Sequence, residues 1–351
     1  MSRCKVLVVD DSALVRQILV TILRQDPEIE VVGTASDPYV AWEKIKTLKP
    51  DVLTLDVEMP RMDGLQFLQK LMIARPMPVV MVSSLTERGC ETTLRALELG
   101  AVDYVSKPKL DVREETQRLS EELVGKVKAA GHARVRRSTT SSPASRMGPE
   151  LQTKARSSLI RSTQKVLVIG ASTGGTGAIY DVLTALPADS PGVVIVLHMP
   201  AGFTRSFANR LDGASRIRVS EAKDGDRILD GHALLAPGGF HMTVARSGAS
   251  YSVHVAAGDP VNRHCPSVDV LFESCARTLG SNATGAILTG MGADGARGLL
   301  AMRTAGAKTI AQDEATCVVF GMPREAILLN GADQVLPLGS IAEGLLKNVN
   351  C

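Results

Sequence analysis

The sequence has few aromatic residues, which make up 3% of its 351 positions. Proteins that bind single-stranded nucleic acid usually stack the bases on aromatic side chains. The net charge is only +3, from 40 basic and 37 acidic residues, and a nucleic-acid-binding surface would normally require a larger basic excess. We therefore expect no nucleic-acid partner.

Long apolar runs are also absent from the chain. No stretch approaches the roughly 20 apolar residues that cross a bilayer, and the apolar run that ends at Asp10 is too short for a signal peptide. The six cysteines form no CxxC pair, which favours unpaired thiols in a reducing compartment. These absences predict a cytoplasmic protein without direct membrane insertion.

What the sequence does contain is a repeated alternation of short apolar runs with stretches of helical periodicity. In residues 1–125 this pattern predicts an α/β domain of five strand–helix units, a (βα)5 fold of the flavodoxin-like type. The expected strands are 6–9, 31–34, 52–55, 79–82 and 103–105.

The alternation returns in residues 164–351 and predicts a second doubly wound α/β domain with a mainly parallel sheet. Its strand order cannot be derived from the pattern. The expected strands are 166–169, 193–197, 233–236, 286–289 and 308–311. The expected helices between several of them include 177–186, 269–278 and 295–305.

The segment 126–163 separates the two domains and is predicted to be a linker. Its later part is rich in Ser, Thr and Arg, and residues 131–165 carry eight basic side chains against one acidic side chain, Glu150. Such a composition cannot bury a core. The positive charge favours solvation, and a weak contact with an acidic partner is the alternative.

Acidic residues follow two strands of the first domain. Asp10 and Asp11 end the first strand, Asp56 ends the third, Ser83 ends the fourth, and Lys107 follows the fifth. Strand carboxyl ends meet at one edge of a parallel sheet, so these groups should share one crevice. Three carboxylates repel one another, which favours a bound Mg²⁺ ion. Asp56 is the candidate nucleophile for a phosphoryl group that Lys107 and Ser83 would stabilise.

A single Asp at a strand end is more often a helix N-cap, but the whole set is more specific. It comprises the acidic pair together with the segments 55–60, 63–64, 82–84 and 104–108. These segments resemble the receiver domain of bacterial response regulators. The resemblance implies that a histidine kinase phosphorylates Asp56, and that Ser83 and Tyr104 form a switch pair.

The same resemblance implies the ligands of the Mg²⁺ ion. They would be Asp11, Asp56 and the backbone carbonyl of Glu58, with Asp10 as an outer ligand.

In the second domain, a glycine-rich turn at 170–177 follows a strand and would expose the Ser172 hydroxyl. His198 and Asp294 also follow predicted strands, so a Ser–His–Asp triad can form at one sheet edge. The chain order Ser, His, Asp differs from that of α/β-hydrolases. A phosphate-binding turn is the alternative, although the GxGxxG spacing and a Walker lysine are both missing.

Five segments of this domain, 169–175, 198–204, 236–242, 261–269 and 288–295, closely resemble the catalytic domain of chemotaxis protein-glutamate methylesterases. The resemblance implies hydrolysis of glutamyl methyl esters on methyl-accepting chemoreceptors, and deamidation of receptor glutamines. It also implies a chemotaxis histidine kinase as phosphodonor and a location at chemoreceptor arrays. No cofactor is expected in this domain.

Two further expectations concern the second domain. The backbone amides near Thr173 and Met291 are candidates for the oxyanion site, and the unphosphorylated receiver is expected to cover the mouth of the Ser172 site. A nucleotide-binding effector domain, a DNA-binding regulator and an inactive adaptor are the competing interpretations.

Overall fold

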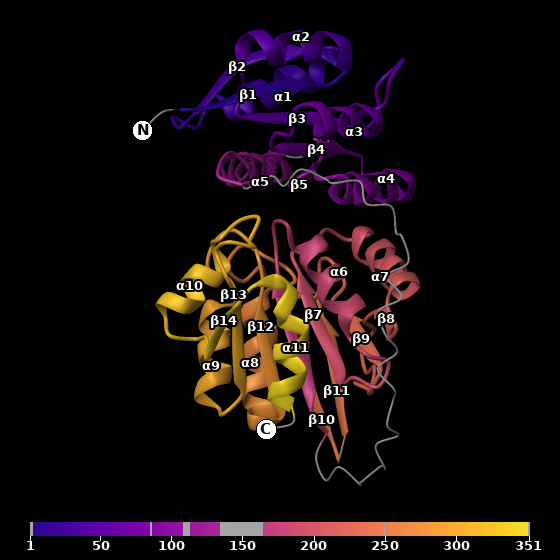
Figure 1. The fold of residues 1–351 in the computed structure, drawn as a ribbon, viewed down its shortest axis with the longest axis vertical. Coiled ribbons are helices and arrows are strands. Elements are labelled where there is room, and N and C mark those ends of the chain that lie inside the picture. The colour runs from indigo at the N-terminus through magenta and orange to yellow at the C-terminus, as the bar shows by residue number, and fades with distance from the viewer. Residues whose placement is uncertain (1–2, 85, 108–112, 134–163, 249, 350–351) are drawn as a thin grey trace.

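The chain folds into two α/β lobes, one above the other in Figure 1. The computed structural model describes residues 3–349 except 85, 108–112, 134–163 and 249. Most of the predicted linker therefore lies outside the described residues.

The N-terminal lobe contains one parallel sheet in the order β2-β1-β3-β4-β5. The strand order reverses between β1 and β3, which is where parallel α/β sheets form their ligand sites. The strands are β1 (Cys4–Val9), β2 (Ile29–Ala35), β3 (Val52–Asp56), β4 (Val79–Ser83) and β5 (Asp103–Ser106).

Five helices alternate with these strands. They are α1 (Ala13–Leu23), α2 (Pro38–Leu48), α3 (Gly64–Ala74), α4 (Glu87–Glu98) and α5 (Arg113–Gly131). Helices α1 to α4 each begin after a polar N-cap whose side chain accepts a backbone N–H bond, namely Ser12, Asp37, Asp63 and Thr86. Helix α5 continues to Gly131, past the predicted domain boundary at residue 125.

The C-terminal lobe contains a seven-stranded parallel sheet in the order β14-β13-β12-β6-β7-β9-β8. Its strands are β6 (Val166–Ala171), β7 (Gly192–Leu197), β8 (Arg218–Glu221), β9 (His232–Leu235), β12 (Ala283–Ile287), β13 (Lys308–Gln312) and β14 (Gln334–Leu336). An antiparallel hairpin of β10 (His241–Ser247) and β11 (Ser250–Ala256) lies outside this sheet.

Helices cover both faces of the seven-stranded sheet. Alternate residues of β6 point to opposite faces, so Leu167 and Ile169 pack with α6, α7 and α11, whereas Val166 and Val168 pack with α8, α9, α10 and the hairpin. The helices are α6 (Gly175–Ala185), α7 (Phe203–Ala214), α8 (Val268–Leu279), α9 (Ala296–Thr304), α10 (Met322–Leu328) and α11 (Leu338–Val349), with a short 3₁₀ turn at Gly280–Asn282.

The observed elements agree with the expected α/β alternation and differ at some boundaries. Strand β12 ends at Ile287, two residues before the predicted end at residue 289. Thr289 instead takes part in the loop below Ser172, where its carbonyl oxygen accepts a hydrogen bond from the Ser172 amide.

The two lobes meet along β5, α4 and α5 of the N-terminal lobe (Figure 1). The Tyr104 ring, at the second position of β5, stacks on the Phe203 ring at the start of α7, with 4.4 Å between ring centroids. Two ion pairs also join the lobes, Arg210 with Glu98 and Arg263 with Glu121. The strand carboxyl ends of the lower sheet therefore face the upper lobe.

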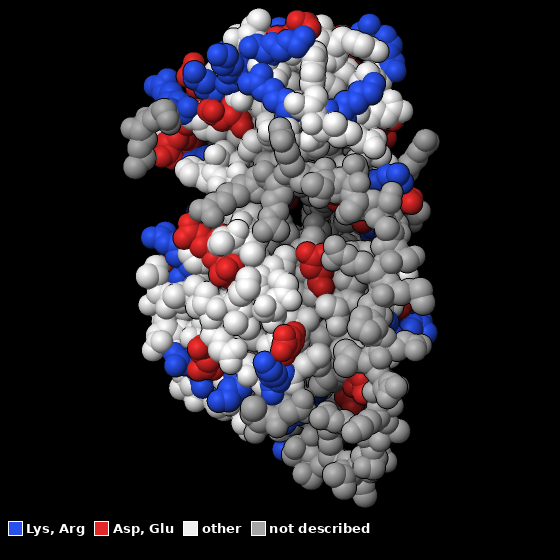
Figure 2. All heavy atoms as spheres, in the orientation of Figure 1, with Lys and Arg blue, Asp and Glu red and all other residues white. Residues whose placement is uncertain are grey.

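The composition-based expectations can be compared with the described part of the chain. None of its five cysteines forms a disulfide, and Cys351 lies outside it. No helix there combines the length and apolarity needed to cross a bilayer. Figure 2 shows acidic side chains interspersed among the Lys and Arg side chains on the face drawn.

Candidate phosphoacceptor and hydrolytic sites

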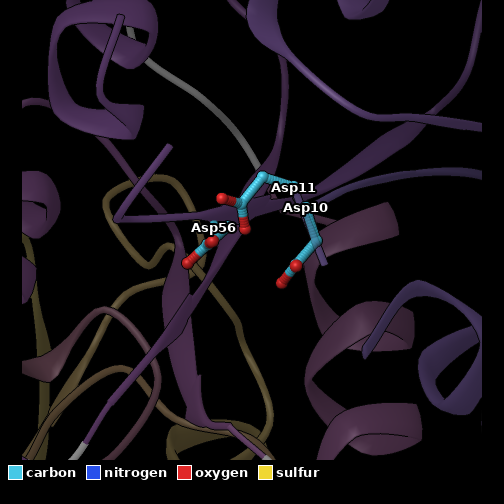
Figure 3. Close-up of side chains that lie close together, drawn as sticks. All are labelled: Asp10, Asp11 and Asp56. Carbon is cyan, nitrogen blue, oxygen red and sulfur yellow. The ribbon is translucent and has the colours of Figure 1, made fainter. Parts of the chain in front are cut away.

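Three carboxylates gather at the switch point of the N-terminal sheet. Asp10 and Asp11 follow β1, and Asp56 ends β3, as Figure 3 shows. One oxygen from each lies within 4.8 Å of the other two. Asp10 and Asp56 are fully buried, whereas Asp11 is exposed. The sequence prediction that these residues share a crevice is therefore correct.

Lys107 provides the positive charge of this crevice. Its Nζ lies 2.8 Å from Asp56 Oδ1 and 3.8 Å from Asp10 Oδ2. Burial is the main cause that raises the pKa of Asp56 to about 6, and the charge of Asp10 adds to it, against the lowering effect of Lys107. Burial also raises the pKa of Asp10. Since one lysine does not balance three carboxylates, the crevice favours a further cation.

The carboxylates retain capacity to bind such a cation. Asp10 Oδ2 and Asp56 Oδ2 are buried, and neither has a hydrogen-bond partner among the described residues. Buried oxygens of this kind are costly unless they are paired. An all-oxygen donor set with several charged members suits a hard divalent cation such as Mg²⁺.

The two expected switch residues lie on neighbouring strands, β4 and β5. The Ser83 hydroxyl is buried and donates weakly to the carbonyls of Ser84 and Gly89. The Tyr104 hydroxyl is buried without a hydrogen-bond partner among the described residues, and burial raises its pKa well above the usual value. Its ring also stacks on Phe203, so Tyr104 contributes to the contact between the two lobes.

Ser172 lies on a tight turn between β6 and α6. The Gly175 amide donates to the Ser172 carbonyl at 2.7 Å, and Gly174 has a φ of +76°. A Cβ atom on Gly290 would lie 2.8 Å from Ser172 Cβ, so this loop also needs glycine where it approaches Ser172. The glycine-rich sequence therefore brings two loops close together around the Ser172 side chain.

His198 and Asp294 are hydrogen-bonded at the same sheet edge. His198 follows β7, and its Nε2 lies 2.8 Å from Asp294 Oδ2 in a buried setting. The other ring nitrogen, Nδ1, is buried and has no hydrogen-bond partner among the described residues. Since Asp294 occupies Nε2, Nδ1 is the ring nitrogen that remains available to a further hydrogen-bond partner.

Asp294 is held by a set of donors that sequence reasoning did not single out. Its Oδ1 accepts hydrogen bonds from Asn262 Nδ2 at 2.7 Å and from Ser267 Oγ at 2.8 Å, and its Oδ2 accepts one from the Val268 amide. Burial alone would raise the pKa of Asp294, but the bonds from His198, Asn262 and Ser267 hold it well below the usual range. Asp294 therefore stays ionised and can orient His198.

These partners could not be identified one by one from the sequence. They lie in the segment 261–269, which carries part of the family resemblance but does not show which side chain reaches Asp294. The contacts arise because the start of α8 packs beside the loop after β12.

Comparisons with known proteins agree with this architecture. A family model described as CheB methylesterase matches residues 167–345, and a model of the response regulator receiver domain matches residues 6–118. The chain belongs to the CheB methylesterase family. This result confirms the resemblance and the two-domain α/β fold predicted from the sequence.

Relatives in this family are similar over almost the whole chain. A protein of Bordetella parapertussis named protein-glutamate methylesterase/protein-glutamine glutaminase is 60% identical, covering 99% of this chain and 98% of its own. A protein-glutamate methylesterase/protein-glutamine glutaminase 2 of Pseudomonas aeruginosa is 59% identical, covering 97% and 96%. The crystal structure of the Thermotoga maritima CheB methylesterase catalytic domain is 39% identical, with a TM-score of 0.52, and covers 53% of this chain and 98% of that one.

In this CheB-family chain, the receiver and the hydrolytic site share one small cavity. Ser172 and His198 line it from the catalytic domain, and Asp103 and Tyr104 line it from the receiver. Its volume is about 10 Å³, which is room for about one water molecule. The receiver therefore forms part of the lining of the cavity beside Ser172.

A hydrogen bond next to Ser172 ties the two domains together. The buried Thr173 hydroxyl donates to Asp103 Oδ2, and Lys126 Nζ lies 3.3 Å from Asp103 Oδ1. Burial would lower the pKa of Lys126, but Asp103 and Glu122 raise it, so the lysine stays charged. Thr173, which follows the candidate nucleophile Ser172, is therefore hydrogen-bonded to the Asp103–Lys126 ion pair of the receiver.

The candidate oxyanion residues lie on the two loops beside Ser172. Thr173 follows Ser172 directly, and Met291 follows Gly290, whose backbone packs against Ser172. The Met291 side chain lies against α5, since a Cβ on Gly125 would be 2.9 Å from Met291 Cε.

Proposed function

We propose that this protein hydrolyses glutamyl methyl esters on chemoreceptors, using Ser172, His198 and Asp294 as a catalytic triad. The observation that carries the proposal is the His198–Asp294 hydrogen bond at the carboxyl edge of the sheet. His198 and Ser172 line the same cavity at that edge. The names of the relatives, protein-glutamate methylesterase/protein-glutamine glutaminase, supply the substrate class.

The proposed mechanism gives each of the three residues one role. Ser172 Oγ attacks the ester carbonyl while His198 Nδ1 takes its proton, and Asp294 stabilises the resulting imidazolium through Nε2. The bond to the methoxy group then breaks, and His198 returns the proton so that methanol leaves. Water, deprotonated by His198, cleaves the acyl-enzyme to release the glutamate and restore Ser172.

The backbone amides of Thr173 and Met291 would donate to the oxyanion that forms during both steps. One such donor contributes about 3–4 kcal/mol to stabilisation of the transition state. A receptor glutamine fits the same route, with ammonia as leaving group, so deamidation needs no additional residue.

Asp56 is the proposed phosphoacceptor of the receiver, with a chemotaxis histidine kinase as phosphodonor. Its pKa of about 6 leaves it mostly ionised and nucleophilic at neutral pH. Asp10, Asp11, Asp56 and the Glu58 carbonyl would hold Mg²⁺, whose charge would offset that of the carboxylates and the phosphoryl oxygens. Lys107 and the Ser83 hydroxyl would bind the phosphoryl group.

Phosphorylation would control access to Ser172. A phosphoryl group on Asp56 adds a charge of roughly −1.5 to −2. It would draw on Ser83, which ends β4, and on Lys107, which follows β5, the strand that carries the contact residue Tyr104. A change in β5 loosens the Tyr104–Phe203 stack and widens the cavity. The receptor substrate also supports the expected location at chemoreceptor arrays.

The triad is tested by methanol release from methylated receptor membranes in the presence of a small phosphodonor. Ser172→Ala should reduce the rate at least about 10³-fold, because no other group replaces the nucleophile. Ser250→Ala, on the distant hairpin, is the matched control and should retain full activity. A Ser172→Ala protein within a few-fold of wild type would contradict the proposed nucleophile.

A further inference from the structure

His264 lies against the proposed catalytic base, and no role for it was predicted from the sequence. The imidazole rings of His198 and His264 are stacked, with 3.6 Å between centroids and 11° between planes. Asp294 is hydrogen-bonded to Nε2 at the edge of the His198 ring. The His264 ring covers one face of the same imidazole.

A tight turn fixes the position of His264. Val261 and His264 exchange two backbone hydrogen bonds of 3.0 and 2.9 Å, and the two residues between them, Asn262 and Arg263, have φ values of 51° and 70°. Two consecutive left-handed residues form a turn of the I′ kind, an uncommon conformation for an arginine. The turn is therefore specific, and it determines where the ring of His264 lies.

The same turn reaches the other member of the hydrogen-bonded pair. Asn262 Nδ2 donates to Asp294 Oδ1 at 2.7 Å and to Asp269 Oδ2 at 2.8 Å. One four-residue turn thus contacts Asp294 through Asn262 and His198 through His264. This arrangement sets the position of the Asp294 carboxylate relative to the His198 imidazole.

We propose that His264 is a positioning residue whose ring face holds the His198 imidazole in the orientation that joins Asp294 to Ser172. The proposal rests on the proposed function of the triad. Without the stacked ring, His198 could rotate about its side-chain bonds, and a misplacement of about 1 Å can reduce a rate about 100-fold.

The electrostatic setting of His264 agrees with this role. Burial lowers its pKa to about 3, with a further lowering by His198, Lys126 and Arg263 and an opposing effect of Asp294. His264 is therefore uncharged at neutral pH, and its ring can remain stacked when His198 becomes an imidazolium. A charged His264 would instead repel it.

The test measures methanol release by the full-length chain with a phosphodonor, for His264→Ala, His264→Phe and the control His254→Ala. His254 is exposed on β11 and bonded to Asp224, so its loss should leave kcat unchanged. For His264→Ala we expect kcat to fall about 10- to 100-fold with KM within about threefold of wild type, since positioning acts on the chemical step. His264→Phe, which keeps a flat ring, should recover most of kcat.

A proton NMR signal provides a second readout that a general loss of stability would not reproduce. The strongly deshielded proton of the His198–Asp294 hydrogen bond should persist in His264→Phe and be lost in His264→Ala, at temperatures where both remain folded. A kcat of His264→Ala within threefold of wild type, or equal losses in the Ala and Phe variants, would overturn the positioning role. An inactive wild type would instead refute the proposed function itself.

Discussion

Asp294 accepts hydrogen bonds both from the candidate base and from the backbone at the start of α8. Replacing it should therefore affect stability as well as activity. We expect Asp294→Ala to lower the free energy of unfolding by about 2–3 kcal/mol, because several buried donors lose a charged acceptor. Ser172→Ala should leave it almost unchanged, and urea unfolding of both variants checks the difference.

The pH dependence of that stability has a definite sign. The folded pKa of Asp294 is depressed, so its contribution is complete above the unfolded value of about 4 and is lost as the pH falls below it. The difference between wild type and Asp294→Ala should shrink on acidification below about pH 4. A difference that stays constant there would mean that the carboxylate charge is not what stabilises this region.

The carboxylates of the receiver predict that metal binding is also lost on acidification, but at a higher pH. The raised pKa of Asp56, about 6, means that protons compete with a cation at mildly acidic pH. Mg²⁺ should raise Tm at about pH 7.5 and have little effect at about pH 5. Asp56→Asn should lose most of the increase, and an equal increase for wild type and variant would place the ion elsewhere.

At the scale of elements, strands buried on both faces were predicted well. The segments that became β1, β3, β4, β6 and β7 are continuous apolar runs, which is how such strands appear in a sequence. Strands β8 and β14 were missed because they are short edge strands with few buried residues, and the hairpin β10–β11 because it packs outside the sheet.

The residues of the candidate sites that could be predicted are those that lie at or directly after the end of a strand. Asp56, His198 and Ser172 each end or follow a strand, so local sequence is enough to place them. Asn262, His264 and Ser267 lie in a loop, and only the packing of α8 beside the loop of Asp294 brings them to the site. The hydrophobic periodicity of the sequence does not predict that packing.

Asp103 of β5, itself paired with Lys126 of α5, accepts the Thr173 hydroxyl bond that joins the receiver to the catalytic domain. Asp103→Ala removes the acceptor of the Thr173 hydroxyl and should weaken the closed form by about 1.5 kcal/mol. Activity without phosphodonor should then rise roughly tenfold. Glu43→Gln, on the exposed face of α2, is the control, and an unchanged basal rate in folded Asp103→Ala would show that this bond does not hold the domains together.

At the scale of the whole molecule, residues of the receiver line the cavity beside Ser172. Tyr104 stacks on Phe203, and the apolar cores of the two domains form one continuous cluster. Moving an equilibrium from 1:99 to 99:1 requires about 5.5 kcal/mol. One phosphoryl group is therefore expected to open only part of the population, and removing the receiver should activate the enzyme further.

The most direct measurement is the rate of methanol release from methylated receptor membranes by the full-length chain, with and without a small phosphodonor, beside Asp56→Asn and the fragment 164–351. We predict a low basal rate, a clear increase with phosphodonor, no increase for Asp56→Asn and a high rate for the fragment. A full-length chain as active without phosphodonor as the fragment, or an Asp56→Asn variant that still responds, would contradict control of the Ser172 site by the receiver.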